Sequence, residues 1–378
     1  MEKKRDKILL VQLYSNGDCL YATTVAQQIK KDFPGCHLTW AIASFCKDII
    51  KLNPFVDDVR IVNNVSKNNI TAFRKFKQEV LIEKKRGDWN EVFITSNIDD
   101  NQALYDGTIR GMILRAYPGK ITVPIQPVLV LDDNEKKKVA DFATLHNLSK
   151  FKNVILWEYA PQSGQNTLNF DVVKRIASKL VSEQNTCVIL SAANAFESTK
   201  NIFDASVLTI RENAALSHYC TLLIGASSGI TWLCTSSAGK FLPMIQLLNP
   251  NAYFFNAPSV DFKRYDLSDD NLIELIEFDE RKIYECASSA VNKGFKTTKD
   301  LYNQNIPLQF KTTSKIIYNL LCYMQFNAIF KHLKVVYSVY GLKIAFLKQF
   351  ILGIISFPFK LGYNFFNKRV LKTKAIKI

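Results

Sequence analysis

The chain has 378 residues, of which 48% are hydrophobic, so it is too apolar for a disordered chain and long enough for two domains of roughly 150 residues with an extra segment. The 49 lysines and arginines exceed the 34 aspartates and glutamates and give a formal net charge of +15, but ten basic residues and no acidic one lie in residues 321–378. The excess charge therefore belongs to a tail, and since no nucleic-acid-binding module is found, we expect no nucleic-acid partner.

Short runs rich in valine, isoleucine and leucine recur along the chain and are separated by helical patterns. They cover residues 7–14, 37–43, 58–62, 90–95, 152–157, 186–191, 221–225 and 241–248. Continuous apolar strands between helices are typical of parallel sheets that are covered on both faces. The pattern predicts the α/β class, with two Rossmann-like, doubly wound parallel-sheet domains.

The first strand runs into LYSNGDCLYATT, residues 13–24. Gly17 allows a sharp turn from strand to helix, and Asp18 falls in the first turn of that helix, where the macrodipole and free amides favour its ionised form. An ionised carboxylate at the mouth of a cleft can remove a proton from a hydroxyl group, although ordinary helix capping explains the same residues. We predict that Ser15, Asn16 and Gly17 line the cleft beside Asp18.

The alternation of strands and helices breaks at residues 118–135, where three prolines fall within ten residues before a new helix begins. We therefore predict one domain in residues 1–130, a second in residues 131–320 and a tail in residues 321–378. Ligands of such folds bind at the carboxyl ends of the strands, so we expect the site in a cleft between the two domains.

A polar loop follows the strand at residues 152–157 and contains Ser163, Gly164, Gln165 and Asn166. Loops of this composition after a strand often hold polar ligands. We predict ligand contacts from these four residues, and a plain surface connection is the alternative.

The stretch LLIGASSGITWLCTSSAG, residues 222–239, predicts a strand, a turn and a helix rich in small residues. Backbone amides at such a helix start accept phosphate groups without a lysine, so Ser227, Ser228 and Gly229 are candidate diphosphate contacts. Two alternatives stay open, namely tight packing of a crossover and the G-x-S-x-G nucleophile elbow of a hydrolase. For the hydrolase, the histidine that follows the serine would be His332.

The eight cysteines are scattered, without a C-x-x-C pair and without clustering near the four histidines. This argues against a zinc site and a disulfide framework and favours a reducing compartment. The N-terminus reads as a first strand and not as a signal peptide, so we expect a cytoplasmic protein. The chain has no D-x-D pattern, and we therefore expect no metal and no cofactor, with the charge of a leaving diphosphate stabilised by helix starts and hydrogen-bond donors.

The N-terminal run resembles glycosyltransferase family nine, the ADP-heptose:lipopolysaccharide heptosyltransferases. The matching elements are Ser15, Gly17 and Asp18 in the turn, then Thr23-Thr24, Phe33-Pro34 and Asn53-Pro54-Phe55-Val56-Asp57. IGASSGITWLCTSSAGKFLPMIQLLNP looks like the family's donor-site segment, and the match spans about residues 7–250. The resemblance implies a GT-B fold in which residues 1–130 bind the acceptor and residues 131–320 bind a nucleotide-sugar donor.

The resemblance also implies that Asp18 is the catalytic base of an inverting, metal-independent transfer and that Gly229 and its neighbours contact the donor. Three positions depart from the family pattern: Ser227 stands for an aspartate, Trp232 for a histidine, and Gln165 or Asn166 for a lysine. Each departure removes a charged or titratable group, so the donor nucleotide and sugar stay open. We expect a transferase that acts on a lipid-linked glycan, such as a lipopolysaccharide core or O-chain precursor, or a catalytically silent scaffold with the same fold.

The tail, residues 321–378, fits no part of a nucleotide-binding fold and alternates aromatic and aliphatic residues with lysine. Its longest uncharged stretch, Gln349 to Phe359, has 11 residues, whereas a spanning helix needs ~20. Lysines bind anionic leaflets and aromatic side chains suit the headgroup region. We expect residues 326–378 to associate peripherally with the anionic inner face of a bacterial inner membrane, while residues 311–325 pack back on the N-terminal domain.

Overall fold

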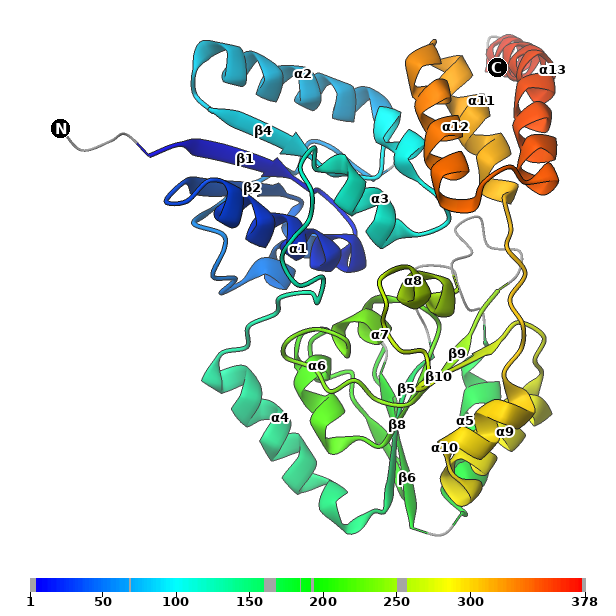
Figure 1. Ribbon diagram of the computed structural model, residues 1–378. Helices are drawn as coiled ribbons and strands as arrows, with labels where there is room; N and C mark the ends of the chain where they lie inside the picture. The colour runs from blue at the N-terminus through cyan, green and yellow to red at the C-terminus, as the bar shows by residue number, and fades with distance from the viewer. Residues whose placement is uncertain are drawn as a thin grey trace.

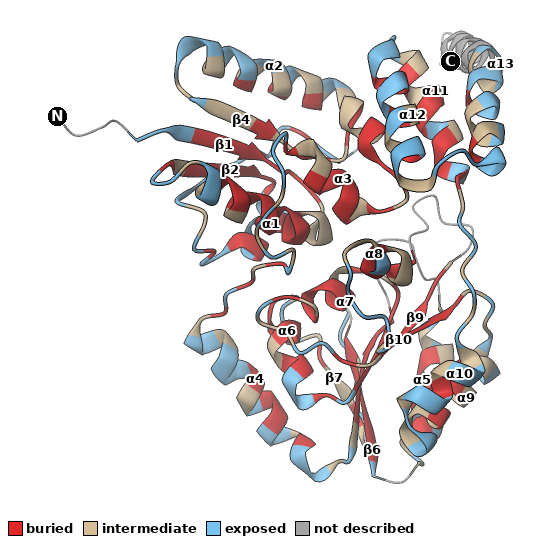
Figure 2. Cartoon of the chain, in the orientation of Figure 1, coloured by how far each residue is buried: buried red, intermediate tan, exposed pale blue. Residues whose placement is uncertain are grey.

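The computed structural model contains two parallel β-sheets covered by helices and a group of three C-terminal helices (Figure 1). It describes residues 5–67, 69–159, 168–183, 185–191, 194–249 and 257–375, with the side chains of the last helix described as far as Phe359. Buried residues line the strands and the helix faces that cover them (Figure 2). The α/β class and the two parallel sheets predicted from the sequence are confirmed.

The N-terminal lobe is built on a four-stranded sheet with the order β3-β2-β1-β4, in which all neighbours are parallel. Its elements are β1 (Lys7–Val11), α1 (Asn16–Asp32), β2 (His37–Ile42), the 3₁₀ helix η1 (Ser44–Ile50), β3 (Asp58–Ile61), α2 (Ile70–Arg86), β4 (Glu91–Ile94), the 3₁₀ helix η2 (Asp99–Leu104) and α3 (Ile109–Ala116). The register places Val11 beside Ala41 and Ile94. The carboxyl ends of three strands therefore meet where the chain enters α1.

The C-terminal lobe is built on a six-stranded parallel sheet with the order β10-β9-β8-β5-β6-β7. Its elements are α4 (Asp133–Leu145), η3 (Leu148–Lys150), β5 (Asn153–Glu158), α5 (Phe170–Leu180), β6 (Thr186–Ser191), β7 (Ile202–Asp204), α6 (Glu212–Leu216), η4 (Ser217–Tyr219), β8 (Leu222–Gly225), α7 (Gly229–Leu233), β9 (Met244–Leu247), α8 (Pro258–Arg264), β10 (Leu272–Leu275), α9 (Glu280–Lys293) and α10 (Phe295–Tyr302). The short strands β7 and β10 were not predicted from the sequence. Because β5 and β8 are neighbours at the centre of the sheet, the segments that follow them lie close together.

A buried arginine fastens the two lobes beside the linker. Arg211, 2% exposed, donates to the backbone oxygens of Asp48 in η1 and of Val130 in the linker. It also forms an ion pair of 2.7 Å with Glu135, which completes a capping box with Asp132 at the start of α4. The start of the second lobe is thus held by contacts to both lobes.

The C-terminal helices are α11 (Lys311–Cys322), α12 (Phe326–Tyr340) and α13 (Ile344–Ala375), and they form a group beside the N-terminal lobe (Figure 1). Helices α11 and α12 contact η2, and α13 packs on α11. Both α11 and α12 pack on this lobe, whereas the sequence predicted such packing for residues 311–325 only. The physical reason is the apolar face of α12, on which Ala328 and Ile329 join the core of the N-terminal lobe. The domain boundaries at residues 130 and 320 stay a prediction.

Helix α13 runs along α11 and approaches it closely at Gly353. A Cβ atom on Gly353 would lie 2.8 Å from Ile317 Cβ and 2.9 Å from the Ser314 oxygen, so the approach requires glycine. Gly341, with φ +67°, separates α12 from α13. In the part of the chain that the structure describes, no helix is both long and apolar enough to cross a bilayer.

Candidate functional site

Asp18 is the third residue of α1, which starts beyond the carboxyl end of β1. Ser15 holds the N-cap position, and its backbone N–H donates to the Asp18 carboxylate. This contact is one half of a capping box, so the capping explanation is met in part. A carboxylate has about four lone-pair sites, and one amide therefore leaves Asp18 able to accept a proton from a ligand.

The environment of Asp18 raises its pKa to about 7. The main cause is removal of the carboxylate from water, which is opposed by the positive charge of Lys67 and by the Ser15 amide. The macrodipole was expected to favour the ionised form, but desolvation outweighs it. A carboxylate with this pKa exchanges protons near neutral pH, as a general base must.

The start of α1 faces α7 of the other lobe. A Cβ atom on Gly17 would lie 3.9 Å from Trp232 Cδ1, and the rings of Tyr21 and Trp232 make an edge contact with centroids 5.3 Å apart. Ser15, Asn16, Gly17 and Asp18 are all partly exposed at this point. The structure thus brings the predicted Asp18 turn and the helix that follows the predicted donor turn to one interface between the lobes.

The start of α7 is already engaged by a carboxylate of the protein. Ser228 is the N-cap of α7, and its hydroxyl donates to Glu158 Oε1. The backbone amides of Ile230 and Thr231 also donate to Glu158, which is 7% exposed and whose pKa burial raises to about 7. Sequence reasoning missed Glu158, although the single acidic residue at the end of the strand NVILWE was a visible signal. The Ser228 hydroxyl and two amides of the first turn of α7 therefore bind a side chain of the protein, and diphosphate binding by Ser227, Ser228 and Gly229 stays a prediction.

The turn before α7 is also shaped by internal contacts. Ser227 adopts a left-handed conformation with φ +51°, and its amide donates to Gln246 Oε1 over 2.6 Å. A Cβ atom on Gly225 would lie 2.6 Å from Thr231 Oγ1, so glycine is required there. This agrees with tight packing of the crossover, and Gly229 begins α7 beside it. The predicted loop of Ser163, Gly164, Gln165 and Asn166 lies outside the described residues, so its role stays a prediction.

A buried ion pair joins the lobes next to these segments. Arg110 on α3 and Asp261 on α8 are 2% and 1% exposed, and Arg110 Nε lies 3.2 Å from Asp261 Oδ2. The guanidinium carbon of Arg110 lies 4.8 Å from the centre of the Tyr21 ring and 5.7 Å from that of Trp232. Burial raises the pKa of Asp261, against the attraction of Arg110. Tyr21 of α1, Trp232 of α7 and this ion pair thus form one group of contacts between the lobes.

A second group of polar contacts links α8 to the N-terminal lobe and to α12. The Asp106 carboxylate accepts hydrogen bonds from Arg115 and Arg264 and from the Thr108 hydroxyl. Arg264 also donates to the Tyr340 hydroxyl over 2.9 Å, and that hydroxyl donates to the Asp106 backbone oxygen over 2.7 Å. Residues from both lobes and from the C-terminal helices therefore meet at Asp106. No sequence motif marked these residues.

No family model and no curated protein matches the chain. Its structure is similar to that of a glycosyl transferase family 9 protein from Veillonella parvula DSM 2008, with a TM-score of 0.53 and 16% identity over 77% of this chain and 91% of that one. The E. coli ADP-heptose LPS heptosyltransferase II (TM-score 0.49, 14% identity, 74% and 96% covered) and the E. coli heptosyltransferase WaaC with ADP-2-deoxy-2-fluoro heptose (0.44, 11%, 71% and 92%) are also similar. The protein has the GT-B fold of family 9.

Trp232 of this GT-B fold lies at the interface between the lobes. It is 5% exposed and contacts Tyr21, Phe262 and Arg110. Ser227 lies in the turn before α7. That these two residues stand for a histidine and an aspartate of the family stays a prediction.

The GT-B geometry does not support the hydrolase alternative. His332 lies on α12, where its Nδ1 is 3.2 Å from the Ala103 oxygen and its Nε2 is 3.4 Å from Thr313 Oγ1. Burial lowers the pKa of this imidazole to about 4. Because both ring nitrogens are engaged beside the N-terminal lobe, His332 does not serve Ser227 as a base. His332 instead packs between α12, α11 and the N-terminal lobe.

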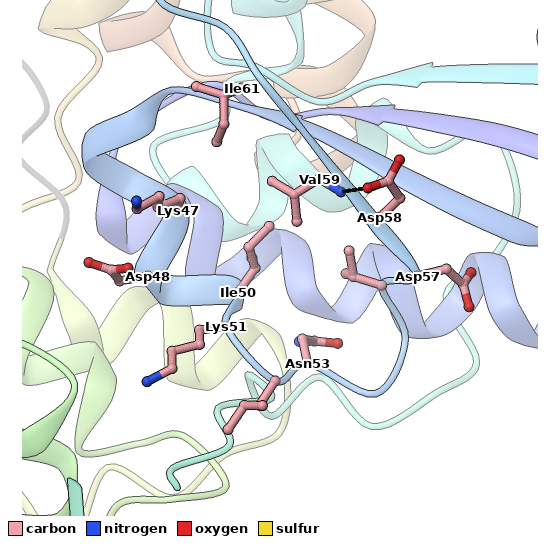
Figure 3. A pocket seen from close by; sticks show the side chains of 11 residues that line it. Lys47, Asp48, Ile50, Lys51, Asn53, Asp57, Asp58, Val59 and Ile61 are labelled. Atoms are coloured by element: carbon pink, nitrogen blue, oxygen red, sulfur yellow. Dashed lines mark hydrogen bonds between the residues drawn. The ribbon is translucent and has the colours of Figure 1, made fainter. Parts of the chain in front are cut away.

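The structure also contains a cavity of about 390 Å³ that is separate from Asp18 and α7 (Figure 3). It lies between η1 and β3, with Lys47, Lys51 and Val59 among its lining residues. Two residues of the family-like motif at this cavity have structural roles. Asn53 donates to the Val128 oxygen in the linker over 3.2 Å, and Asp57 accepts the Leu38 amide over 2.6 Å. Neither Asp18 nor α7 lines this cavity.

Proposed function

We propose that the protein is an inverting, metal-independent glycosyltransferase that moves a sugar from a nucleotide-sugar donor to a lipid-linked glycan, such as a lipopolysaccharide core or O-chain precursor. The GT-B fold is that of nucleotide-sugar glycosyltransferases. The relatives from E. coli include one with ADP-2-deoxy-2-fluoro heptose and one with ADP in their structures. A lipid-linked acceptor places the reaction at the inner face of a bacterial inner membrane.

The observation that carries the proposal is the Asp18 carboxylate at the lobe interface, where burial raises its pKa to about 7. In the proposed step, the acceptor hydroxyl gives its proton to Asp18 while its oxygen forms a bond to the anomeric carbon of the donor. The bond from that carbon to the diphosphate oxygen breaks, and the nucleoside diphosphate leaves with the electron pair. Attack from the face opposite the leaving group inverts the anomeric configuration.

The proposed donor contacts are Ser227, Ser228 and Gly229 together with Ser163, Gly164, Gln165 and Asn166. Glu158 holds the Ser228 hydroxyl and the first amides of α7. A diphosphate that binds there has to share or displace this carboxylate, because two anions at one helix start repel each other. Donor binding is thus expected to favour the protonated form of Glu158.

The test is transfer with purified full-length protein, a panel of nucleotide sugars and a lipid-linked glycan extract. Thermal stabilisation identifies the donor, since selective binding raises apparent stability. Asp18→Asn is expected to bind that donor and to lose transfer, while Asp58→Asn on the exposed edge strand keeps it. Full transfer by Asp18→Asn would overturn the catalytic role.

Glu158 and Trp232 also favour a second candidate, a catalytically silent scaffold with the GT-B fold. The first engages the start of α7, and the second fills the lobe interface with an indole ring. A scaffold shows no stabilisation by any nucleotide sugar and no functional change in Asp18→Asn. Stabilisation by one nucleotide sugar would contradict it.

A further inference from the structure

Many large apolar side chains are exposed on the C-terminal helical unit, which consists of α11, α12 and α13. They are Tyr323, Met324, Phe326, Phe330, Tyr337, Leu342, Ile344, Ile351, Leu352, Ile354, Ile355 and Phe359, each between 39% and 85% exposed. A water-facing surface rarely carries so many in one segment, and exposed patches of this kind mark interaction sites. Figure 2 shows exposed residues along the outer sides of α12 and α13.

Helix α12 separates its apolar, basic and buried residues into distinct sectors. At 100° per residue, Phe326, Phe330 and Tyr337 fall within about 40° of arc, and Lys334 and Lys331 follow within about the next 100°. The three aromatic residues are 57–69% exposed. The opposite side is buried against the N-terminal lobe, for example at His332. The outward side thus combines aromatic side chains with lysines.

Helix α13 carries a second exposed stripe, which is mainly aliphatic. Ile344, Ile351, Ile355 and Phe359 are 85%, 52%, 54% and 74% exposed, and they fall within about 80° of arc together with Lys348. Phe346, on another side of the helix, is buried. The exposed stripe has the apolar character of a core face but contacts no other part of the described chain closely enough to be covered.

The charge of this surface identifies what it fits. Residues 301–378 contain lysine and arginine but no aspartate or glutamate, so the unit attracts anions and repels a second copy of itself. Lysines bind anionic lipid headgroups, aromatic rings settle at headgroup level, and aliphatic side chains enter the acyl boundary. Polyanions without an apolar phase would leave Ile344 and Phe359 in water.

We propose that the outward sides of α12 and α13 dock the protein on the surface of an anionic lipid bilayer. The folded unit docks in place: α12 stays packed on the N-terminal lobe, and Tyr340 at its end holds Arg264 of α8 and Asp106. Docking therefore fixes the orientation of both lobes toward the membrane. The proposal is independent of sugar transfer, because it concerns binding to lipid alone.

Co-sedimentation of the full chain with vesicles tests the proposal. One set of vesicles is phosphatidylcholine alone, and the other contains 30 mol% phosphatidylglycerol. Deletion of α12 and α13 would uncover Ile317 and Ala103, so surface substitutions are used instead. The apolar pair is F330S/I355S, with L145S/V207S as its control at exposed positions of the C-terminal lobe. The basic pair is K331Q/K334Q, with K136Q/K137Q on α4 as its control.

We expect wild type to bind the anionic vesicles, to bind phosphatidylcholine weakly and to dissociate at high salt. The substitutions K331Q/K334Q are expected to weaken partitioning on the order of tenfold or more, and F330S/I355S by a similar factor. Both control variants are expected to bind like wild type, and all variants to show the wild-type circular dichroism. Wild-type binding by F330S/I355S or by K331Q/K334Q would overturn the proposal. A dimer in solution that F330S/I355S abolishes, without vesicle binding by wild type, would assign the surface to a second copy instead.

Discussion

The Ser228 hydroxyl donates a hydrogen bond to the Glu158 carboxylate across the boundary between β8 and β5. The carboxylate also accepts the amides of Ile230 and Thr231, so the first turn of α7 carries a negative charge that belongs to the protein. In the GT-B fold this turn belongs to the lobe proposed to bind the donor. The contact therefore couples the protonation of one buried acid to the region proposed for the diphosphate.

Glu158→Gln tests this coupling through stability. The folded-state pKa of Glu158 is raised from 4.5 to about 7, so the native state binds more protons than the unfolded state between these values and wild type loses stability as pH rises through this window. Relative to E158Q, wild type should lose on the order of 2 kcal/mol between pH 5 and pH 8. Urea unfolding at both pH values measures it, with exposed Glu197→Gln as control. Parallel pH dependences of wild type and E158Q would contradict the contact.

The pH profile of transfer follows from Asp18. Because the carboxylate has to be deprotonated to accept the acceptor's proton, kcat/KM is expected to rise through pH of about 7 and to level off above it. Asp18→Asn should lower kcat by about 10²- to 10⁴-fold and remove this limb of the profile. Initial rates between pH 5.5 and 9 measure both effects. An unchanged limb in D18N would assign it to another group.

The Arg110–Asp261 pair should respond differently to single and double substitution. Asp261→Asn leaves a buried guanidinium without its counter-charge, which costs about 3–5 kcal/mol of unfolding free energy. The double variant R110M/D261L removes both charges and should recover most of this loss. The free energies of unfolding of wild type, D261N and R110M/D261L, measured in denaturant, test this expectation. A D261N variant as stable as wild type would show that the pair is not buried together in solution.

Tyr340→Phe should loosen the junction between the lobes and α12. The substitution removes the hydroxyl that accepts from Arg264 and donates to the Asp106 oxygen, at a cost of about 1–2 kcal/mol. Tyr337→Phe on the same helix is the control, because Tyr337 is 63% exposed. The denaturation midpoints of the two variants test this expectation. Equal midpoints would mean that the hydrogen bonds of the Tyr340 hydroxyl do not stabilise the protein in solution.

The lobes were predictable because their central strands are continuous apolar runs. NVILWE and TCVILS are buried along nearly their whole length, as the pattern indicated. The strands β7 and β10 have three and four residues, which is too short for a periodicity to stand out. Each pairs in parallel with a neighbouring strand of the same sheet, β7 with β6 and β10 with β9, and this pairing is a tertiary effect.

The site was predictable only where a local motif marks it. Asp18 follows a strand and a glycine turn, so its place at the start of α1 could be read from spacing. Arg110, Asp261 and Arg264 come together from α3 and α8, about 150 residues apart in the chain, and no local pattern encodes such a contact. The raised pKa of Asp18 also required the structure, since the sequence shows the helix start but not the loss of water.

Gly353 decides how α13 is turned about its own axis. The missing side chain lets the backbone of α13 sit against Ile317 and Ser314, so rolling the helix to hide its exposed isoleucines would drive a Cβ-bearing neighbour into α11. Gly353 thus fixes the rotation of α13 about its axis, and this rotation keeps Ile344 and Phe359 on the exposed side of the helix.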